Sequence, residues 1–353
     1  MHAKLREMKI LITGASGFIG SFIVEEALKR GFETWAAVRK SSSKAYLQDE
    51  RINFIELNLS SKEQLVEQLR GHQFDYVVHA AGVTKCLNKA DFRRINTEGT
   101  KNLADALIAL QMPLKRFVFV SSLSVFGAIK EKMPYDEIRE TDTPQPNTEY
   151  GRSKLEAERY LDSLGSRIPY IILRPTGVYG PREKDYFIMA KSIKQHSDFA
   201  VGYQRQDITF VYVTDVVQAI FLALEVGDCK SPTTGTTGET ISPIGRKYFL
   251  SDGEVYQSTT FSDLIHEELG RPWWIRITAP VWVLRIVTFF GEYIGRLTGK
   301  VTALNNDKYN ILKQRNWRCD IEPARRELGF EPKVQLQEGV KTTIKWYKDN
   351  GWL

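Results

Sequence analysis

Cysteine is scarce in this 353-residue chain: only Cys86, Cys229 and Cys319 occur, an odd number without a CxxC pair. Such a set argues against a disulfide framework and against a zinc site, and we expect no bound metal. It is typical of a protein in a reducing compartment. The segment from Met1 to Met8 is short and polar and has no secretory signal, so we expect a cytoplasmic protein.

Long uncharged hydrophobic runs are also missing. The most apolar stretch, Trp273 to Gly299, is interrupted by charged residues and never reaches the length that spans a membrane. From Val281 it has the period of an amphipathic helix. Its apolar face would carry Val283, Ile286, Phe290, Ile294 and Leu297, and its polar face Arg285, Thr288, Glu292 and Arg296.

Three interpretations of this amphipathic segment are open. The one we favour packs the helix on the core. The others make it a wall of an apolar substrate pocket, or a peripheral membrane contact through Trp273 to Leu297. A membrane partner is therefore not the main expectation.

The chain lacks a dense run of Lys or Arg, although its net charge is +6 and its pI is near 9.0. This modest excess suits an anionic small ligand better than nucleic acid, which we do not expect as a partner. A hydrophobic fraction of 42% supplies a sizeable core. The length fits one large α/β domain, alone or with a smaller lobe.

The segment from Lys9 to Gly31 reads as strand, glycine turn and helix. A short apolar run is followed by Gly14, Gly17 and Gly20 in a GxxGxxG pattern, and helical spacing of apolar residues follows. Residues without a Cβ let the backbone turn tightly and approach a pyrophosphate, and the helix N-terminus supplies N–H donors. The pattern therefore predicts dinucleotide binding.

Further apolar runs alternate with helical patterns along the first half of the chain. Strands are expected at Glu33–Arg39, Ile52–Leu57, Tyr76–His79 and Phe117–Val120, with a helix at Arg94–Leu110. This rhythm predicts a doubly wound parallel sheet, an α/β Rossmann fold. Ligands of such sheets bind beyond the carboxyl ends of the strands, where Gly14, Ala81 and Ser122 fall. We interpret His79, inside an apolar strand end, as structural.

The end of the second strand bears on the choice of cofactor. An acidic residue there binds the ribose 2′-OH of NAD, whereas a basic one accommodates the 2′-phosphate of NADP. Arg39 and Lys40 follow the strand, and no acid occurs before Asp49. We therefore favour NADP(H) over NAD(H). If Arg39 merely stacks on adenine, the preference stays open.

Tyr150 and Lys154 form a YxxxK pair in a segment of helix-forming composition. Residues four apart lie on one helix face, and an ammonium beside a phenol lowers the pKa of the phenol. Tyr150 is thus a candidate proton donor and acceptor for an alcohol or ketone, with Lys154 tuning it. Ser122, at the end of the fifth strand, is placed to hold the same substrate oxygen.

The motifs TGASGFIG, HAAG, INTEGT, FVFVSSLSVFG, YGRSKLEAE and LRPTGVYGP occur in order along nearly the whole chain. Together they resemble the extended short-chain dehydrogenase/reductase family, the NAD-dependent epimerase/dehydratase group. The resemblance implies Ser122, Tyr150 and Lys154 as catalytic residues. It implies cofactor binding by these two catalytic residues Tyr150 and Lys154 and by Thr13, Gly14, Ser16, Gly17, Phe18, Ile19, Gly20, Arg39, Lys40, Asn58, Leu59, Ala80, Ala81, Gly82, Asn96, Pro175 and Val178.

Departures of this sequence from the family's pattern indicate the branch of the family that it resembles most. Dehydratases resembling this group carry an acid after the catalytic serine, where this chain has Leu123. The arginine that grips a sugar-nucleotide diphosphate is replaced by Ile208, although Arg205 lies near. With the apolar segment after Val281, the chain looks closer to the 3β-hydroxysteroid dehydrogenase and dihydroflavonol reductase branch, which implies a small, fairly apolar substrate.

The expected function is an NAD(P)-dependent oxidoreductase that interconverts a secondary alcohol and a ketone or aldehyde. A sugar-nucleotide epimerase is the alternative, and a non-catalytic NADP-binding regulator is a remote one. The family often dimerises through the helix of Tyr150 and the helix before it, so a homodimer is left open.

The second half of the chain is expected to build a smaller interleaved substrate lobe. We assign residues 1–180 and 206–227 to the Rossmann domain, and 181–205 and 228–353 to the lobe. The segment Phe210–Glu225 is expected to rejoin the sheet as strand and helix, and Gly227–Gly238 reads as a surface loop. A strand is expected at Lys247–Leu250, and helices at Asp185–Gln195, Phe261–Leu269, Asp320–Leu328 and Val340–Asn350.

Overall fold

A computed structural model describes residues 8–226, 244–298 and 305–353. Its centre is a seven-stranded sheet in the order β11-β6-β5-β4-β1-β2-β3, with every neighbouring pair parallel. The strands are β1 (Lys9–Thr13), β2 (Glu33–Val38), β3 (Asn53–Glu56), β4 (Tyr76–His79), β5 (Arg116–Val120), β6 (Tyr170–Pro175) and β11 (Lys247–Leu250).

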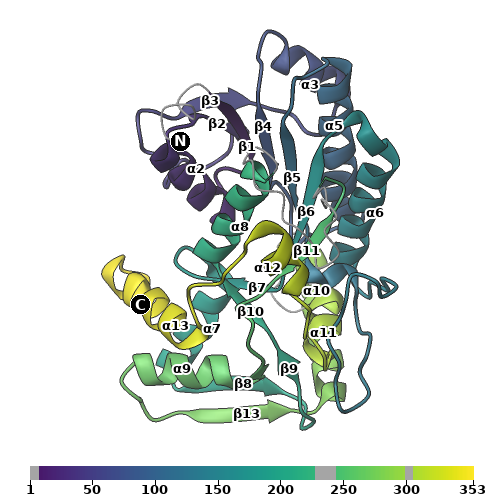
Figure 1. Ribbon diagram of the computed structural model, residues 1–353. Coiled ribbons are helices and arrows are strands. Elements are labelled where there is room, and N and C mark those ends of the chain that lie inside the picture. The colour runs from purple at the N-terminus through teal and green to yellow at the C-terminus, as the bar shows by residue number, and fades with distance from the viewer. Residues whose placement is uncertain (1–7, 227–243, 299–304) are drawn as a thin grey trace.

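Helices cover both faces of this sheet because its strands are apolar on both sides. Along β1, Ile10 and Ile12 point to one core cluster and Leu11 to another. The first cluster is closed by α2 (Phe18–Arg30), α8 (Val213–Glu225) and α12 (Glu322–Leu328), and the second by α3 (Lys62–Leu69), α5 (Gly99–Ala109) and α6 (Glu149–Leu164). The predicted doubly wound Rossmann fold is confirmed (Figure 1).

A smaller lobe lies below the sheet in Figure 1. It contains three two-stranded pairs, β7–β10, β8–β13 and β9–β12. Its elements are β7 (Gly177–Tyr179), α7 (Lys184–Lys194), β8 (Ser197–Val201), β9 (Asp207–Ile208), β10 (Phe210–Tyr212), β12 (Tyr256–Gln257), α9 (Thr260–Glu268), β13 (Ile275–Ala279), α10 (Val281–Thr298), α11 (Asn306–Lys313) and α13 (Leu336–Asp349). Short helical turns complete the chain at α4 (Ala90–Phe92), η1 (Arg93–Glu98), η2 (Leu123–Val125) and η3 (Gly165–Arg167).

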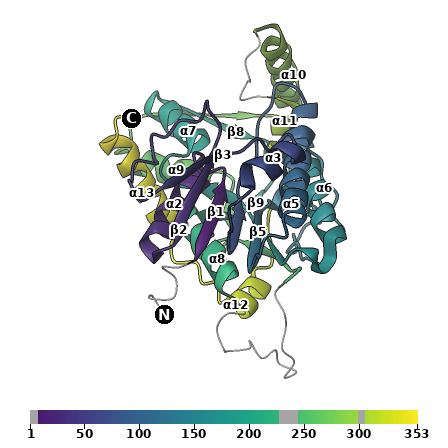
Figure 2. The same ribbon diagram turned by 90° about the horizontal axis from the view of Figure 1, so that it is seen from above.

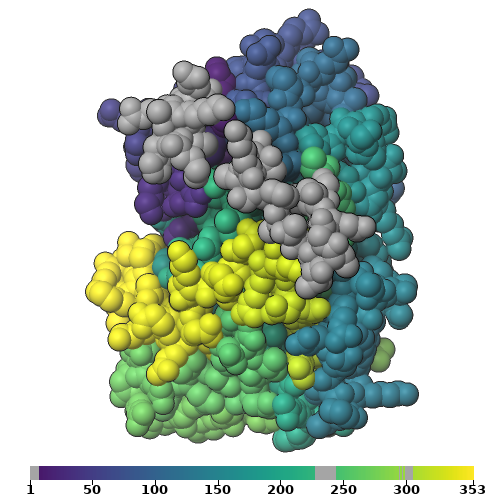
Figure 3. Space-filling view, viewed as in Figure 1, coloured from purple at the N-terminus to yellow at the C-terminus, as the bar shows by residue number. Residues whose placement is uncertain are grey.

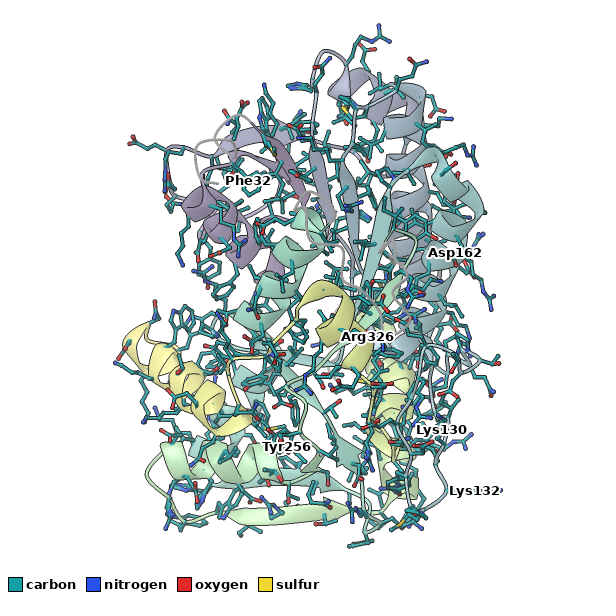
Figure 4. The ribbon with its side chains drawn as sticks, viewed as in Figure 1. Phe32, Lys130, Lys132, Asp162, Tyr256 and Arg326 are labelled. Carbon is teal, nitrogen blue, oxygen red and sulfur yellow. The ribbon has the colours of Figure 1, made fainter. Side chains whose placement is uncertain are left out.

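The C-terminal helices contact both parts of the protein: α12 packs against β11 and α8, and α13 packs against α9 and β10. Figure 3 shows them as a yellow surface between the purple N-terminal residues and the green lobe. In Figure 4, Phe32 lies in the upper part and Tyr256 in the lower lobe. Phe32 stacks edge-on against Tyr76 at a centroid distance of 5.8 Å, while the Tyr256 hydroxyl donates to Asp252 at 2.8 Å.

The prediction that the strand from Phe210 rejoins the main sheet is wrong. β10 pairs with β7 outside the main sheet, and β11 fills the edge beside β6 instead. Only the helix of that segment, α8, packs on the main sheet. β11 lies inside the range 228–353 assigned to the lobe, so this part of the division needs correcting. The predicted loop Gly227–Gly238, with Cys229, lies outside the described residues.

The favoured packing of the helix from Val281 is also wrong. In α10, Ile286, Phe290 and Leu297 of the expected core face are exposed, whereas Thr288 of the expected polar face is buried. The helix therefore meets the rest of the protein with its other side. Among the described helices, none is long and apolar enough to cross a bilayer.

Candidate active site

The glycine turn between β1 and α2 is shaped by close backbone packing. Gly14 has φ +72°, and a Cβ there would lie 2.7 Å from the backbone of Ala80 and Ala81. A Cβ on Gly20 would lie 2.0 Å from the Gly14 carbonyl oxygen. Both positions therefore require glycine, which explains the spacing found in the sequence. The turn brings the ends of β1 and β4 together.

The N-terminus of α2 has free capacity for an anion. Its cap residue is Gly17, which offers no side-chain acceptor, and its first turn contains no acidic residue. The first N–H groups of a helix have no partner within the helix, and they carry the positive end of its dipole. Ser16, Phe18 and Ile19 surround this end and are partly exposed. This geometry fits a diphosphate.

Thr13 and His79 fix the neighbouring strand ends. The Thr13 hydroxyl is bonded to Nδ1 of His79 at 2.7 Å and accepts the Ala81 N–H at 3.3 Å. Nε2 of His79 meets the Thr100 hydroxyl at 3.0 Å. Burial, followed by the nearby Lys154 charge, lowers the pKa of His79 to about 3. With both ring nitrogens occupied, His79 holds strands rather than substrate.

Asn96 lies in the π-helical turn η1 and is fully buried. Its side chain accepts the Val83 N–H at 2.8 Å, donates to the Val83 carbonyl at 3.0 Å, and donates to the Ser153 hydroxyl at 3.0 Å. It thereby ties the loop after β4 to α6. Gly82 lies in that loop, where a Cβ would come within 3.2 Å of the Lys154 Nζ.

The Ser122 hydroxyl lies near enough to Tyr150 to lower the pKa of its phenol. The hydrogen bonds of this hydroxyl are to Ser124: it donates to the Ser124 hydroxyl and accepts the Ser124 N–H, both at 3.2 Å. Ser122 follows β5, and Tyr150 lies in the first turn of α6. The two elements approach closely at Gly151, where a Cβ would lie 2.3 Å from the Ser124 carbonyl oxygen. Ser121 instead donates to Glu158 at 2.5 Å and is buried, so Ser122 is the serine beside Tyr150.

Lys154 is buried one helical turn after Tyr150. Its Nζ donates to the Val120 carbonyl at 2.9 Å and lies 4.7 Å from the centre of the Phe119 ring. Burial lowers its pKa to about 8, an effect that the Glu158 carboxylate opposes. The pKa of Tyr150, expected to fall, is instead raised to about 12, because the effect of burial outweighs the lowering effect of nearby Ser122. Tyr150 is therefore a protonated acid at neutral pH.

Asp307 is a site residue that sequence reasoning missed. It lies in α11, yet its carboxylate accepts the backbone N–H groups of Glu149 at 3.0 Å and Tyr150 at 3.3 Å. Thr148 caps the same helix through the Gly151 N–H at 2.9 Å. The start of α6 is thus held from two directions. An acid in the first turn of α11 gave no signal of a partner 157 residues away.

The residues predicted to bind the adenosine end of the cofactor, Arg39 and Lys40, are accessible to a ligand. Arg39 and Lys40 follow β2, are exposed, and form no ion pair within the described part of the chain. Asn58 is less available: its amide donates to Gln64 at 2.5 Å and its oxygen accepts from Ser60. The Leu59 carbonyl accepts from Asn102 at 3.0 Å. These two residues shape the turn before α3.

The predicted nicotinamide border lies at the end of β6. Pro175 is the last residue of that strand and is buried, and Val178 is half-buried in β7. Ala80 and Ala81 lie at the end of the nearby strand β4, both partly exposed. The structure places these residues at the carboxyl ends of the parallel strands, the edge at which such sheets bind ligands.

In the region expected to bind the diphosphate of a sugar nucleotide, the positive charge of Arg205 is neutralised by an acidic partner. Arg205 donates to Asp207 at 2.7 and 3.3 Å, and Asp207 is buried. Ile208, at the position of the family's arginine, packs against the core cluster of the lobe. Neither residue offers an unpaired cation.

The chain is 26% identical over 347 residues to a UDP-glucose 4-epimerase of Vibrio cholerae, covering 95% of this chain and 94% of that one. It is 27% identical over 310 residues to the 3beta-hydroxysteroid-dehydrogenase/decarboxylase isoform 1 of Arabidopsis thaliana, covering 83% of this chain and 66% of that protein.

Solved structures show the same fold. A UDP-glucose 4-epimerase of Thermotoga maritima with UDP-glucose has a TM-score of 0.74 at 24% identity, over 97% of this chain and 99% of that one. DesIV, a dTDP-glucose 4,6-dehydratase of Streptomyces venezuelae with NAD bound, has a TM-score of 0.76 at 20% identity, covering 98% of each chain. Residues 10–234 match the family described as NAD dependent epimerase/dehydratase. That match contains the glycine turn, Ser122 and the YxxxK pair, and the chain is a member of this family of enzymes.

Proposed function

We propose that this enzyme interconverts a secondary alcohol and a ketone or aldehyde by hydride transfer, with NADP(H) as its favoured cofactor. The observation that carries the proposal is that a protonated Tyr150 lies beside Ser122, one helical turn before buried Lys154 in α6. A neutral phenol at neutral pH is an acid suited to protonating a carbonyl oxygen as it is reduced.

The cofactor would be held by the uncapped α2 helix, with the glycine turn against its diphosphate. When bound, its nicotinamide supplies or accepts the hydride. Ser122 would donate to the substrate oxygen and orient it. Tyr150 would give that oxygen its proton during reduction, and receive the proton back during oxidation. The ammonium of Lys154 would stabilise the phenolate left on Tyr150.

The surroundings favour a substrate of low charge. At the position expected to bind the diphosphate of a sugar nucleotide, Ile208 stands in place of an arginine, and nearby Arg205 is paired with Asp207. Breaking the Arg205–Asp207 pair to bind a diphosphate would leave the buried Asp207 carboxylate uncompensated, which is unfavourable.

Tyr150→Phe tests the assignment. We expect at least about a 10²-fold loss of kcat with NADPH and a carbonyl panel, because the proton donor is removed. Cofactor affinity should stay within a few-fold. Tyr160→Phe is the matched control, since Tyr160 lies in the same helix but donates to Asp105 of α5. Near-normal turnover in Tyr150→Phe would contradict the mechanism.

The cofactor preference is tested at the end of β2. Arg39→Ala combined with Lys40→Ala should weaken NADPH binding at least tenfold and leave NADH binding nearly unchanged, because only NADPH carries the 2′-phosphate. Arg70→Ala, an exposed cation after α3, is the control. Equal losses for both cofactors would indicate that Arg39 stacks on adenine.

A sugar-nucleotide epimerase is the second candidate, favoured by the similarity to UDP-glucose 4-epimerases. It would use tightly held NAD⁺ without net redox. Titration of NADPH, NADH, NADP⁺ and NAD⁺ into cofactor-free protein separates the two. Preference for the phosphorylated forms supports the reductase, and NAD⁺ that cannot be stripped, with turnover of a UDP-sugar, supports the epimerase.

A further inference from the structure

Helix α10 is amphipathic, but its large apolar side chains point to the outside of the protein and not to the core. Six of its large apolar side chains fall within an arc of about 100° when successive residues are placed 100° apart. This apolar face consists of Trp282, Ile286, Phe289, Phe290, Tyr293 and Leu297, and each of these side chains is between 48% and 71% exposed. A helix of a globular protein ordinarily buries such a face.

The opposite side of α10 makes the contact with the protein. Leu284, Thr288 and Gly295 are buried, and Gly291 between them is half-buried. The Thr288 hydroxyl donates to the Leu284 carbonyl at 2.9 Å, so this polar group is satisfied within the helix. α10 packs against α11. Turning the apolar face inward would therefore expose Leu284 and Thr288, which are now buried.

α10 also stands away from the rest of the protein. Figure 2 shows it projecting beyond the outline formed by the sheet and its helices. A projecting helix can reach a flat surface before the remainder of the molecule does. Contiguous exposed apolar patches of this kind mark interaction sites.

The chemistry of the face suits a lipid surface. Trp282 and Tyr293 each carry a polar tip on an apolar ring, the type of side chain enriched where hydrocarbon meets headgroups. Phe289, Phe290 and Leu297 supply purely apolar area. The combination is that of helices that lie in the plane of a membrane interface.

Charge identifies the lipid more closely. Residues 281–300 contain Arg285, Arg296 and Lys300 against the single acid Glu292. Arg285 is exposed, and Glu292 lies 3.8 Å from Lys89. The segment is therefore net positive, which suits anionic headgroups. A second copy of the chain fits less well, because a symmetric pair would bring two positive segments together.

We propose that the apolar face of α10 docks this enzyme on bilayers that contain anionic lipids. The contact is interfacial, with the helix lying in the surface. It is independent of the reaction proposed above, since none of its residues belongs to the candidate active site.

Flotation of the full chain with vesicles tests the proposal. Wild-type protein should float with phosphatidylcholine vesicles containing about 30% phosphatidylglycerol, and less with phosphatidylcholine alone. Phe289→Ser combined with Phe290→Ser should lower the bound fraction at least tenfold, because two phenyl rings leave the bilayer. Ile188→Ser combined with Met133→Ser, which also removes two exposed apolar side chains, should float like the wild type.

A second variant separates charge from apolar contact. Arg285→Glu keeps the apolar face and should weaken binding to anionic vesicles several-fold while leaving binding to neutral vesicles unchanged. The proposal is overturned if wild-type protein floats with neither vesicle, or if the Phe289 and Phe290 variant floats as well as the wild type. It is also overturned if sedimentation without lipid shows a dimer that this variant converts to a monomer.

Discussion

Gly151→Ala tests how closely the distance between Ser122 and Tyr150 is controlled. Gly151 follows Tyr150 in α6, where the helix passes over the turn after β5. A Cβ at this position would lie 2.3 Å from the Ser124 carbonyl oxygen and 3.0 Å from the Thr148 hydroxyl. The nearest atom belongs to backbone, so no side chain can rotate away. The start of α6 and the serine turn must therefore move apart.

The required movement follows from the contact distance. A carbon and an oxygen in ordinary contact lie roughly 3.2–3.4 Å apart, so the two elements must separate by about 1 Å. A misplacement of about 1 Å can cost about 10²-fold in rate. Overpacking of this kind also lowers the free energy of unfolding by about 1–3 kcal/mol. We therefore expect kcat to fall by about 10²-fold in a protein that still folds.

Three measurements on the purified variant are needed: kcat with the best carbonyl substrate, cofactor affinity by titration, and unfolding in urea. Gly99→Ala is the matched control, because Gly99 is also helical but its Cβ would meet the Leu59 Cβ at an ordinary 3.5 Å. That variant should keep normal kcat. If Gly151→Ala retains kcat within threefold, the approach of α6 to the serine turn does not set the catalytic geometry.

Three further predictions concern charged residues. Asp307→Ala should lower kcat about tenfold and stability by about 1–2 kcal/mol in urea, since it frees two N–H groups at the start of α6. Burial raises the pKa of Glu140 to about 7, above the ordinary 4.5, so the folded protein binds the extra proton and stability declines as pH rises from about 4.5 to 7. Glu140→Gln should remove that decline and add on the order of 1 kcal/mol at pH 8, with no gain at pH 4. Because burial lowers the pKa of Lys154 to about 8, kcat/KM for reduction should fall above pH 8 as the ammonium is lost, and a profile flat to pH 9.5 would contradict its role.

Local pattern was enough to predict the core of the fold. The alternation of apolar residues along the first strands, with helical spacing between them, predicted a sheet covered on both faces. The positions of Gly14 and Gly20 were predictable because a strand–turn–helix leaves little room for a Cβ. Even the choice of Ser122 over Ser121 agrees with the geometry, since Ser121 turns inward to Glu158.

Tertiary contacts decided what local pattern could not. Phe210–Tyr212 and Lys247–Leu250 are both short apolar runs, and only packing against β6 determines which one extends the sheet. Asp307 acts on α6 across a long stretch of chain. The pKa of Tyr150 was predicted in the wrong direction, because the sequence shows the neighbouring lysine but not the depth at which the phenol is buried.

The orientation of α10 shows why periodicity alone misleads. A hydrophobic period identifies which side chains share a face, but it does not identify the surface that the face meets. In α10 a second signal was present: the small residues Thr288, Gly291 and Gly295 follow the same period on the opposite side. Small residues in a row let a helix approach its neighbour closely, while bulky aromatic residues such as Phe289 hold it off. Where both rows occur in one helix, the small row is a competing candidate for the inward face, and an apolar row turned outward then requires a separate partner.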